Sequence, residues 1–501
     1  MRNSLKISTV ALAILLFAGC TKNFEKINDD PNNPKNVPNS YLLTGALKGL
    51  ADNNFDHWWG GQVGNQLAQY WASNQYSSES RYLFRPTVTG DYWSSFYSGA
   101  NNNDALVQVG GLFELQYIID KCKADPAGVS TEGDAGNQIA VATIIRVWQM
   151  QRITDTWGMA PYSEALKGAA NPQPKYDSQR DIYLGLLAEL DNALSLINGG
   201  AGPTGDIIYQ GDMSLWAKFG NSLKCRLAIR LADREPVLAA QKINEAVTAG
   251  VFTSNSENAQ LNYLSNVPNT NLHFYDINVN NRLDFCASNT MIDLMNTMSD
   301  PRIGIYFDKA VTSNSYVGEV YGLSEANGAA TANDDVSQRG EAVVGATAPA
   351  VFMSYAEVQF ILAEAVERGF ITGTAANYYN DGVIASMGSW GVSGGDVTTY
   401  LAQPSVDYAT LITGGSSWKQ IIGKQKWLAL YNQGLEAWAE WRRLDFGILQ
   451  LPADGVMDGT GIPLRLKYPN DEQTLNGAHY TEAVGLQGAD EQDTRLWWDM
   501  N

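Results

Sequence analysis

Histidine and basic residues are scarce in this chain of 501 residues. Its three histidines, at positions 57, 273 and 479, are too few for a metal centre built from imidazoles, and we expect neither a metal nor a cofactor. Lys and Arg together number 34 against 53 Asp and Glu, which gives a formal net charge of −19. A field of this sign repels phosphate backbones, so nucleic-acid binding is not expected.

Cysteine is equally rare. The four cysteines, Cys20, Cys122, Cys225 and Cys286, are far apart and form no C-x-x-C pair. The last three do not make an even disulfide framework, so we expect buried apolar thiols, and whether any two of them form a bridge stays open. No run of eighteen apolar residues follows the N-terminus, so no later segment is expected to span a membrane as a helix.

Catalytic motifs are also missing. The chain has no H-E-x-x-H, G-x-S-x-G, Walker A or dinucleotide fingerprint, and we expect no enzymatic activity. Acidic residues are numerous enough to supply a glycosidase pair. Glu436 and Glu440, however, lie one helical turn apart beside Arg442 and Arg443, and an ion-paired helix face is the simpler interpretation.

One segment resembles the start of a calcium-binding loop, Asp276-Ile277-Asn278-Val279-Asn280. An EF-hand would place Gly and Glu at the positions of Asn281 and Ala287. An Asn-rich turn with side-chain hydrogen bonds is therefore favoured, and calcium binding stays open.

The N-terminus has the pattern of a secretion signal. Arg2 and Lys6 precede an apolar run from Ile7 to Phe17, and small residues lead to Cys20. This pattern predicts a lipoprotein signal peptide over 1–19 and acylation of Cys20, although an ordinary signal with an incidental cysteine is the alternative. Several acyl chains would anchor the mature protein stably, and its charge would be 32 − 53 = −21.

A polar segment rich in Pro, Asn and Asp follows, and it predicts an acylated N-terminal tether and loop over 20–40. Beyond it no linker divides the chain, so we expect a single helical domain over 41–501. Apolar residues recur there at spacings of three and four, which predicts helices in four segments, 182–197, 216–231, 355–365 and 427–438. Gln138 to Ile153 is apolar nearly all round and predicts a buried helix. Neighbouring helices with short links favour an all-α fold of stacked hairpins.

Three segments, 73–90, 266–282 and 312–349, are polar, aromatic or Gly-rich and are not expected to be helical. The tail from Leu451 to Asn501 is loop-rich as well. Long irregular segments in a compact domain are usually functional or mobile. We therefore expect these loops to form the functional face of the molecule.

Seven segments, in order along the chain, together resemble one protein family. They are the lipoprotein start with Phe24–Asn32, Asp155–Ala165, Gly211-Asp212, Trp216–Asp233, Asp300-Pro301-Arg302, Tyr355–Ala365, and Gly434–Trp438 with Trp441–Arg443. The chain resembles the SusD/RagB family of outer-membrane nutrient-binding lipoproteins, and more narrowly the SusD-like branch with a tetratricopeptide-type helical scaffold.

The resemblance implies a non-enzymatic protein that is anchored by lipid in the outer membrane and exposed on the cell surface. Its expected partner is a SusC-like TonB-dependent transporter, which it covers as a lid. Its expected ligand is an oligosaccharide or a peptide. Two alternatives remain: a secreted all-helical glycoside hydrolase, and a structural helical-repeat scaffold that binds partners but no small ligand.

Sugars offer C–H faces that stack on flat aromatic rings and hydroxyl groups that need fixed donors and acceptors. Composition alone directs attention to loops that combine Trp and Tyr with Asn and Arg. The candidate ligand-binding residues are Trp71, Asn74, Tyr76, Arg81, Tyr82, Trp93, Tyr275, Asn280, Arg282 and Tyr321. The aromatic residues would stack on the ligand, and Arg81 and Arg282 would donate hydrogen bonds.

Overall fold

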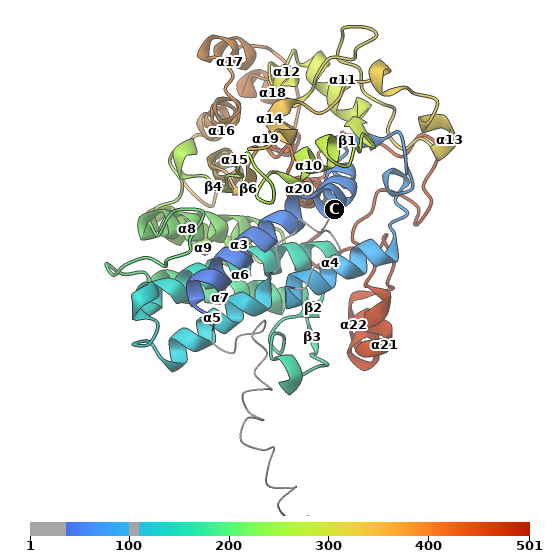
Figure 1. Ribbon diagram of the computed structural model, residues 1–501. Coiled ribbons are helices and arrows are strands. Elements are labelled where there is room, and N and C mark those ends of the chain that lie inside the picture. Colours follow the sequence, from blue (N-terminus) through green and yellow to red (C-terminus); the bar gives the residue numbers. More distant parts are fainter. Residues whose placement is uncertain (1–36, 100–109, 501) are drawn as a thin grey trace, which may run out of the picture.

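The computed structural model describes residues 37–99 and 110–500 (Figure 1). The signal peptide predicted over 1–19, Cys20, and the tether up to residue 36 lie outside the described residues. The helices of the N-terminal half pack side by side, α5 on α6, α6 on α7 and α8 on α9. Their bounds are α3 (Asn39–Phe55), α4 (Pro86–Ser98), α5 (Leu112–Ala124), α6 (Ala135–Trp157), α7 (Gln179–Leu196), α8 (Met213–Arg230) and α9 (Pro236–Ala249).

The C-terminal half repeats this arrangement, with α15 packed on α16 and on α19. Its helices are α15 (Tyr355–Glu367), α16 (Ala375–Ser389), α17 (Gly394–Leu401), α18 (Tyr408–Thr413), α19 (Trp418–Ala429), α20 (Gly434–Leu444), α21 (Asn470–Leu475) and α22 (Gly477–Gln487). Short helices connect the halves: α10 (Leu272–Asn278), α11 (Asn289–Thr297), α12 (Ile303–Tyr306), α13 (Glu325–Gly328) and α14 (Glu341–Val344).

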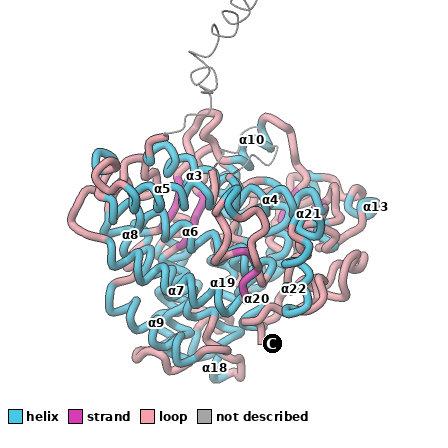
Figure 2. The backbone as a smooth tube through the Cα atoms, turned by 90° about the horizontal axis from the view of Figure 1, so that it is seen from below, coloured by secondary structure: helices cyan, strands magenta, loops and turns pink. Residues whose placement is uncertain are grey.

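Strands are few and short (Figure 2). Three antiparallel two-stranded ladders are described: β1 (Trp71–Ser73) with β5 (Phe285–Ala287), β2 (Ala160–Pro161) with β3 (Tyr176–Asp177), and β4 (Ala259–Leu261) with β6 (Ala350–Met353). A π-helix of nine residues, η1 (His57–Asn65), and five short 3₁₀ turns complete the described elements: η2 (Glu79–Arg81), η3 (Ser130–Glu132), η4 (Gly168–Ala170), η5 (Asn255–Glu257) and η6 (Asn333–Asp335). The all-α, tetratricopeptide-like fold is confirmed.

Four of the predicted helices are confirmed, and each begins at a side-chain cap. The caps of α6, α7, α8 and α15 are Asp134, Ser178, Asp212 and Ser354, whose oxygens accept hydrogen bonds from backbone N–H groups of the first turn. Asp212 belongs to the Gly211-Asp212 segment of the family resemblance. That segment therefore fixes where a helix starts.

The continuous helix predicted over 427–438 is wrong, because α19 ends at Ala429 and α20 starts at Gly434. Asn432 has a φ of +64°, in the left-handed region that interrupts a right-handed helix and that Asn tolerates better than most residues. The Oδ1 atom of Asn432 accepts a hydrogen bond of 2.9 Å from Asn65 of η1. The turn between α19 and α20 is therefore hydrogen-bonded to η1.

The prediction of non-helical structure over 73–90, 266–282 and 312–349 is partly wrong. These segments contain the first residues of α4, the whole of α10, and the short helices α13 and α14. The calcium-like residues Asp276 to Asn278 form the end of α10, and Asn280 donates a 2.9 Å hydrogen bond to Asp276. No group of three or more His, Cys, Asp or Glu that could hold a metal occurs within residues 37–99 and 110–500.

Cys122, Cys225 and Cys286 carry free, buried thiols, as expected from their spacing. Burial raises the pKa of Cys122 to about 11 and that of Cys225 to about 12. These thiols therefore stay protonated at neutral pH and act as small apolar side chains.

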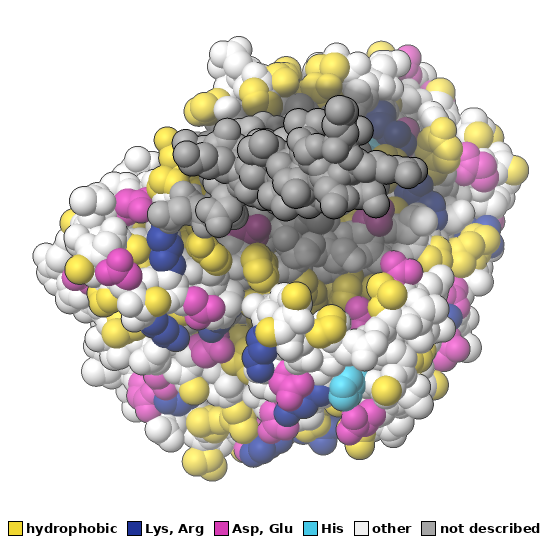
Figure 3. All heavy atoms as spheres, turned by 60° about the horizontal axis from the view of Figure 1, so that its bottom comes forward, with side chains coloured by type: hydrophobic (Ala, Val, Ile, Leu, Met, Phe, Trp, Pro, Cys, Tyr) yellow, Lys and Arg dark blue, Asp and Glu magenta, His cyan; other side chains and the backbone are white. Residues whose placement is uncertain are grey.

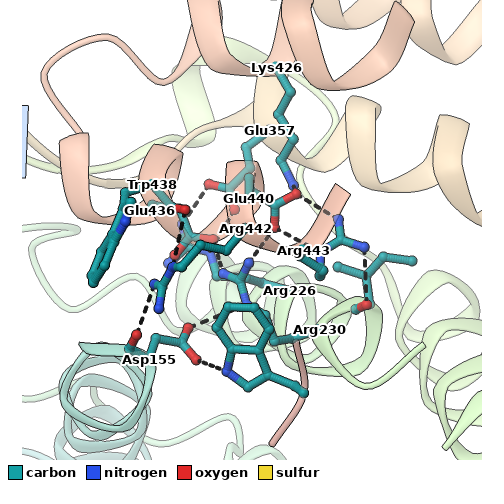
Figure 4. A network of polar contacts seen from close by, with 12 residues as sticks. Asp155, Arg226, Arg230, Glu357, Lys426, Glu436, Trp438, Glu440, Arg442 and Arg443 are labelled. Atoms are coloured by element: carbon teal, nitrogen blue, oxygen red, sulfur yellow. Dashed lines mark hydrogen bonds and ion pairs between the residues drawn. The ribbon is translucent and has the colours of Figure 1, made fainter. Parts of the chain in front are cut away.

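Two hydrophobic cores lie in the two halves, and α15 and α20 contribute to both. Val358 and Phe360 of α15 face different cores, as do Trp438 and Leu444 of α20. Where α8, α15 and α20 meet, ten buried charged residues form an ion network (Figure 4). Five are acids and five are bases: Asp155, Glu357, Glu364, Glu436, Glu440, Arg226, Arg230, Lys426, Arg442 and Arg443. Arg442 joins the network by donating a 2.9 Å hydrogen bond to the backbone carbonyl of Asp155.

Glu440 lies at the centre of this ion network. Its carboxylate is 2.6 Å from Arg230, 2.9 Å from Lys426 and 2.6 Å from Arg443. Burial acts to raise the pKa of Glu440, but these three cations outweigh it and hold that pKa well below its ordinary range. The ion-paired helix face predicted from the spacing of Glu440 and Arg443 is therefore confirmed, with partners from α8 and α19 in addition.

The C-terminal tail seals one side of the network. Trp498 is fully buried, and its Nε1 donates a 2.9 Å hydrogen bond to Asp155. The Arg442 guanidinium lies 4.9 Å from one Trp498 ring and 3.5 Å from the Trp438 ring. Asp155 is also 3.3 Å from Arg230. The last residues of the chain thus complete the core of the N-terminal half.

Glu436→Gln removes one of the three carboxylates that pair with Arg230, beside Asp155 and Glu440, and leaves the buried network with one uncompensated positive charge. We expect a loss of about 3–5 kcal/mol in the free energy of unfolding, because breaking a buried ion pair strands the remaining charge. Urea denaturation measures this loss. Glu235→Gln is the matched control: it breaks the half-exposed pair of Glu235 with Arg180 and should cost less than about 1 kcal/mol. Equal losses in the two variants would contradict a special role for the network.

Candidate ligand-binding surface

Pairing of β1 with β5 brings two distant loops to one end of a ladder. Ser73, the last residue of β1, faces Phe285, the first residue of β5. Because the pair is antiparallel, the residues that follow Ser73 lie beside those that precede Phe285. The Tyr76 ring consequently lies 5.9 Å from the Arg282 guanidinium.

Trp58 of η1 and Arg85 before α4 complete this surface. The Trp58 ring is half-buried, with the Arg282 guanidinium 4.6 Å and the Arg85 guanidinium 5.0 Å from its centre. Tyr76 is 60% exposed and presents its ring to solvent. We call Trp58, Tyr76, Arg85 and Arg282 the aromatic–arginine surface.

Each arginine of this surface is fixed by one carboxylate. Arg282 donates to Asp284 at 2.9 and 2.7 Å, and Arg85 donates to Glu79 at 2.8 Å. Burial raises the pKa of Glu79, and the opposing effect of Arg85 is smaller. The surface therefore offers oriented guanidinium groups with little net charge. The face drawn in Figure 3 likewise mixes basic and acidic side chains over its visible parts.

A buried layer supports the surface from below. His57 of η1 stacks on Phe285 at 4.5 Å, and its nitrogens lie 3.4 Å from Asp284 and 3.8 Å from Asp276. Burial lowers the pKa of His57 despite these two acids, so the imidazole is mainly neutral at pH 7. The layer therefore packs against Asp284, the carboxylate that holds Arg282, without adding a charge.

Five of the ten sequence-predicted site residues are buried and present no open face to a ligand in this structure. They are Trp71, Asn74, Tyr82, Trp93 and Tyr321. Their polar atoms are used internally: Trp71 donates to the Tyr431 hydroxyl at 3.0 Å, Trp93 donates to Glu472 at 3.1 Å, and Tyr321 donates to the Gln66 carbonyl at 2.8 Å. Tyr82 accepts from Gln69 at 3.0 Å, and Asn74 donates to Asn333.

Three more predicted residues lie near the surface of the molecule without joining the aromatic–arginine surface. Arg81 donates to the backbone carbonyls of Asp454 and Gly455. Tyr275 is half-buried on α10, and Asn280 is exposed just beyond it. Tyr76 and Arg282 are brought together on the aromatic–arginine surface, whereas the Tyr82 and Tyr321 rings pack against each other in the interior, 6.2 Å apart. The role of these residues in binding stays a prediction.

Sequence reasoning missed Trp58 and Arg85. Trp58 is followed by Trp59, which is only 1% exposed and stacks on Trp157 at 5.2 Å. Two adjacent tryptophans must point in different directions on a helix, but the sequence does not say which one faces out. The run His57-Trp58-Trp59 before two glycines was the available signal.

The chain matches a family model over residues 31–469, described as SusD-like and "Starch-binding associating with outer membrane". The chain belongs to the SusD-like family. The resemblance of the seven segments is thereby confirmed. Membership in the SusD-like family supports a carbohydrate-binding role and association with the outer membrane. A comparison with curated proteins found no match.

Solved structures of the SusD-like type superpose over most of the chain. A chitin-binding protein covers 92% of this chain and 100% of its own, with a TM-score of 0.79 and 27% identity. A chitin-binding SusD homolog from Flavobacterium johnsoniae covers 92% and 99%, with a TM-score of 0.76 and 25% identity. A SusD homolog from Bacteroides uniformis covers 92% and 100%, with a TM-score of 0.76 and 27% identity. Within the residues described here, no helix is long and apolar enough to cross a membrane.

Tyr76→Ala and Trp71→Ala should differ strongly in their effect on the free energy of unfolding, because one ring is exposed and the other is buried. Removing the exposed Tyr76 ring should change the free energy of unfolding by no more than about 0.5 kcal/mol. Removing the fully buried Trp71 ring should cost about 3–5 kcal/mol, because it leaves a cavity and the Tyr431 hydroxyl loses its donor. Urea denaturation of both variants tests this difference. A large loss for Tyr76→Ala would show that its ring is packed.

Proposed function

We propose that the protein is a lipid-anchored nutrient-binding protein of the outer membrane, exposed at the cell surface. It captures an oligosaccharide on the aromatic–arginine surface and delivers it to a SusC-like TonB-dependent transporter, which it covers as a lid. The observation that carries the proposal is the exposed Tyr76 ring beside half-buried Trp58, with Arg85 and Arg282 placed to donate hydrogen bonds.

The chemistry of this surface suits a neutral sugar. Aromatic faces stack on the C–H faces of pyranose rings, and guanidinium N–H groups donate to hydroxyl and carbonyl oxygens. The carboxylates Glu79 and Asp284 neutralise the two arginines, so an anionic ligand gains little. Two structurally similar proteins are described as chitin-binding. We therefore propose an N-acetylated β-linked oligosaccharide as the first ligand class, with a peptide as the second.

No enzymatic activity is part of this proposal. The acids that the sequence first suggested for a glycosidase pair, Glu436 and Glu440, are 2% and 1% exposed and bound to cations. A general acid needs access to the bond it cleaves. The glycoside hydrolase alternative predicts free reducing ends after incubation with oligosaccharide, and the scaffold alternative predicts no small ligand at all.

Calorimetry with chitin oligosaccharides should give binding to the wild-type protein, and Tyr76→Ala should weaken it about tenfold, equivalent to ~1.4 kcal/mol. Tyr41→Ala is the matched control, because Tyr41 is 72% exposed but lies near the start of α3. At about 1.5 Å per residue, it is about 20 Å from the end of α3 that leads into η1. Equal weakening by both substitutions would contradict the placement of the site at Tyr76. Binding of only a peptide or a starch oligosaccharide would contradict the proposed ligand class.

The partner is tested on the full-length lipoprotein extracted from its native outer membrane in mild detergent. We expect a stoichiometric TonB-dependent barrel to copurify and to be identified by mass spectrometry. We also expect the complex to bind ligand more tightly than the isolated protein, because closure requires contacts that differ between the open and closed states. Equal affinities would count against ligand-linked closure, and an acylated protein without a barrel would favour the alternatives.

A further inference from the structure

Arg339 is a buried cation without a hydrogen-bond partner among the described residues. Its side chain lies beneath the aromatic–arginine surface, and the residue is only 4% exposed. The guanidinium is 5.1 Å from the centre of the Trp71 ring and 5.6 Å from that of Phe285. None of its three nitrogens, Nε, Nη1 and Nη2, makes a hydrogen bond within residues 37–99 and 110–500.

A second group without hydrogen-bond partners contacts the same tryptophan. The His273 ring meets Trp71 edge-on at 5.1 Å, and neither of its nitrogens has a partner among the described residues. Burial lowers the pKa of His273 well below its ordinary value, and the charge of Arg339 acts in the same direction. His273 is therefore neutral and carries one N–H donor and one acceptor.

Hydrogen-bond donors outnumber acceptors around Arg339. Arg339 has five N–H donors, whereas the neutral imidazoles of His273 and His57, which also have no hydrogen-bond partner among the described residues, offer one acceptor each. The two nearby carboxylates are engaged elsewhere: Asp284 accepts from Arg282 and lies 3.4 Å from His57, and Asp276 accepts from Asn280. The excess of donors calls for a guest that only accepts hydrogen bonds. Aromatic faces attract the guanidinium but leave the N–H groups at its edge unsatisfied.

We propose that the interior beside Arg339 holds a small inorganic monoanion, which is chloride in ordinary salt solution. An anion accepts several N–H groups at once and neutralises the buried charge, whereas a water molecule would bring two further donors. The unpartnered nitrogens have essentially no exposed surface, so the guest must be compact. This anion stabilises Trp71 and Phe285 in β1 and β5, the pair on which the aromatic–arginine surface stands.

Crystals of the wild-type protein grown in sodium bromide test the site directly. We expect an anomalous bromide peak within hydrogen-bonding reach of the Arg339 guanidinium. Density for water alone, or a direct pair between Arg339 and Asp276 or Asp284, would overturn the proposal. The readout does not depend on any sugar ligand, so it is independent of the proposed function.

Thermal unfolding at constant ionic strength provides a second test in solution. Replacing sodium gluconate by sodium chloride should raise the unfolding temperature of the wild-type protein by roughly 2 °C or more, because an anion that binds only the folded state stabilises it. Arg339→Met should lose this response, and Arg180→Met at the surface should keep it. A wild-type protein that does not respond to chloride would overturn the proposal even if Arg339→Met fails to fold.

Discussion

The buried ion network is the constraint on which the rest of the fold depends. Removing ten charges from water is costly, and the cost is offset only when every carboxylate and cation finds its partner. Partners come from α6, α8, α15, α19 and α20, so satisfying the network fixes all five helices relative to one another. Since α20 packs directly on η1, the network also determines where Trp58 lies.

The same residues explain why the family could be identified from sequence although the aromatic–arginine surface could not. Asp155, Arg230, Glu364 and Glu440 lie in or beside segments that carried the resemblance. In the structure Arg230 pairs with both Asp155 and Glu440, and Arg443 links Glu440 to Glu364. The distinctive segments thus encode the scaffold. Several of them contribute charged residues that must pair in the buried ion network. None of them supplies a residue of the aromatic–arginine surface.

Local patterns predicted local structure well. Periodicity located α6, α7, α8 and α15, because each buries an apolar face and starts at a capped turn. Periodicity failed at Asn432, where one left-handed residue divides a continuous apolar pattern into two helices. The exposure of individual rings could not be predicted. Trp71 and Tyr76 are both aromatic residues of one polar segment, and the sequence does not distinguish them. Trp71 is buried because it lies in β1, which pairs with the distant β5, whereas Tyr76 lies beyond the end of β1 and is exposed.

Charge pairing at the surface bears on how a ligand would be held and released. The chain carries a net charge of −19, yet Arg85 and Arg282 each face a single carboxylate, so the aromatic–arginine surface has no strong field of its own. Long-range steering would therefore contribute little to the proposed binding, which would depend on short-range stacking and hydrogen bonds. Such contacts on an open surface give modest affinity. Modest affinity would suit the proposed delivery, because a transporter that adds contacts of its own could then take up a ligand that is only weakly held.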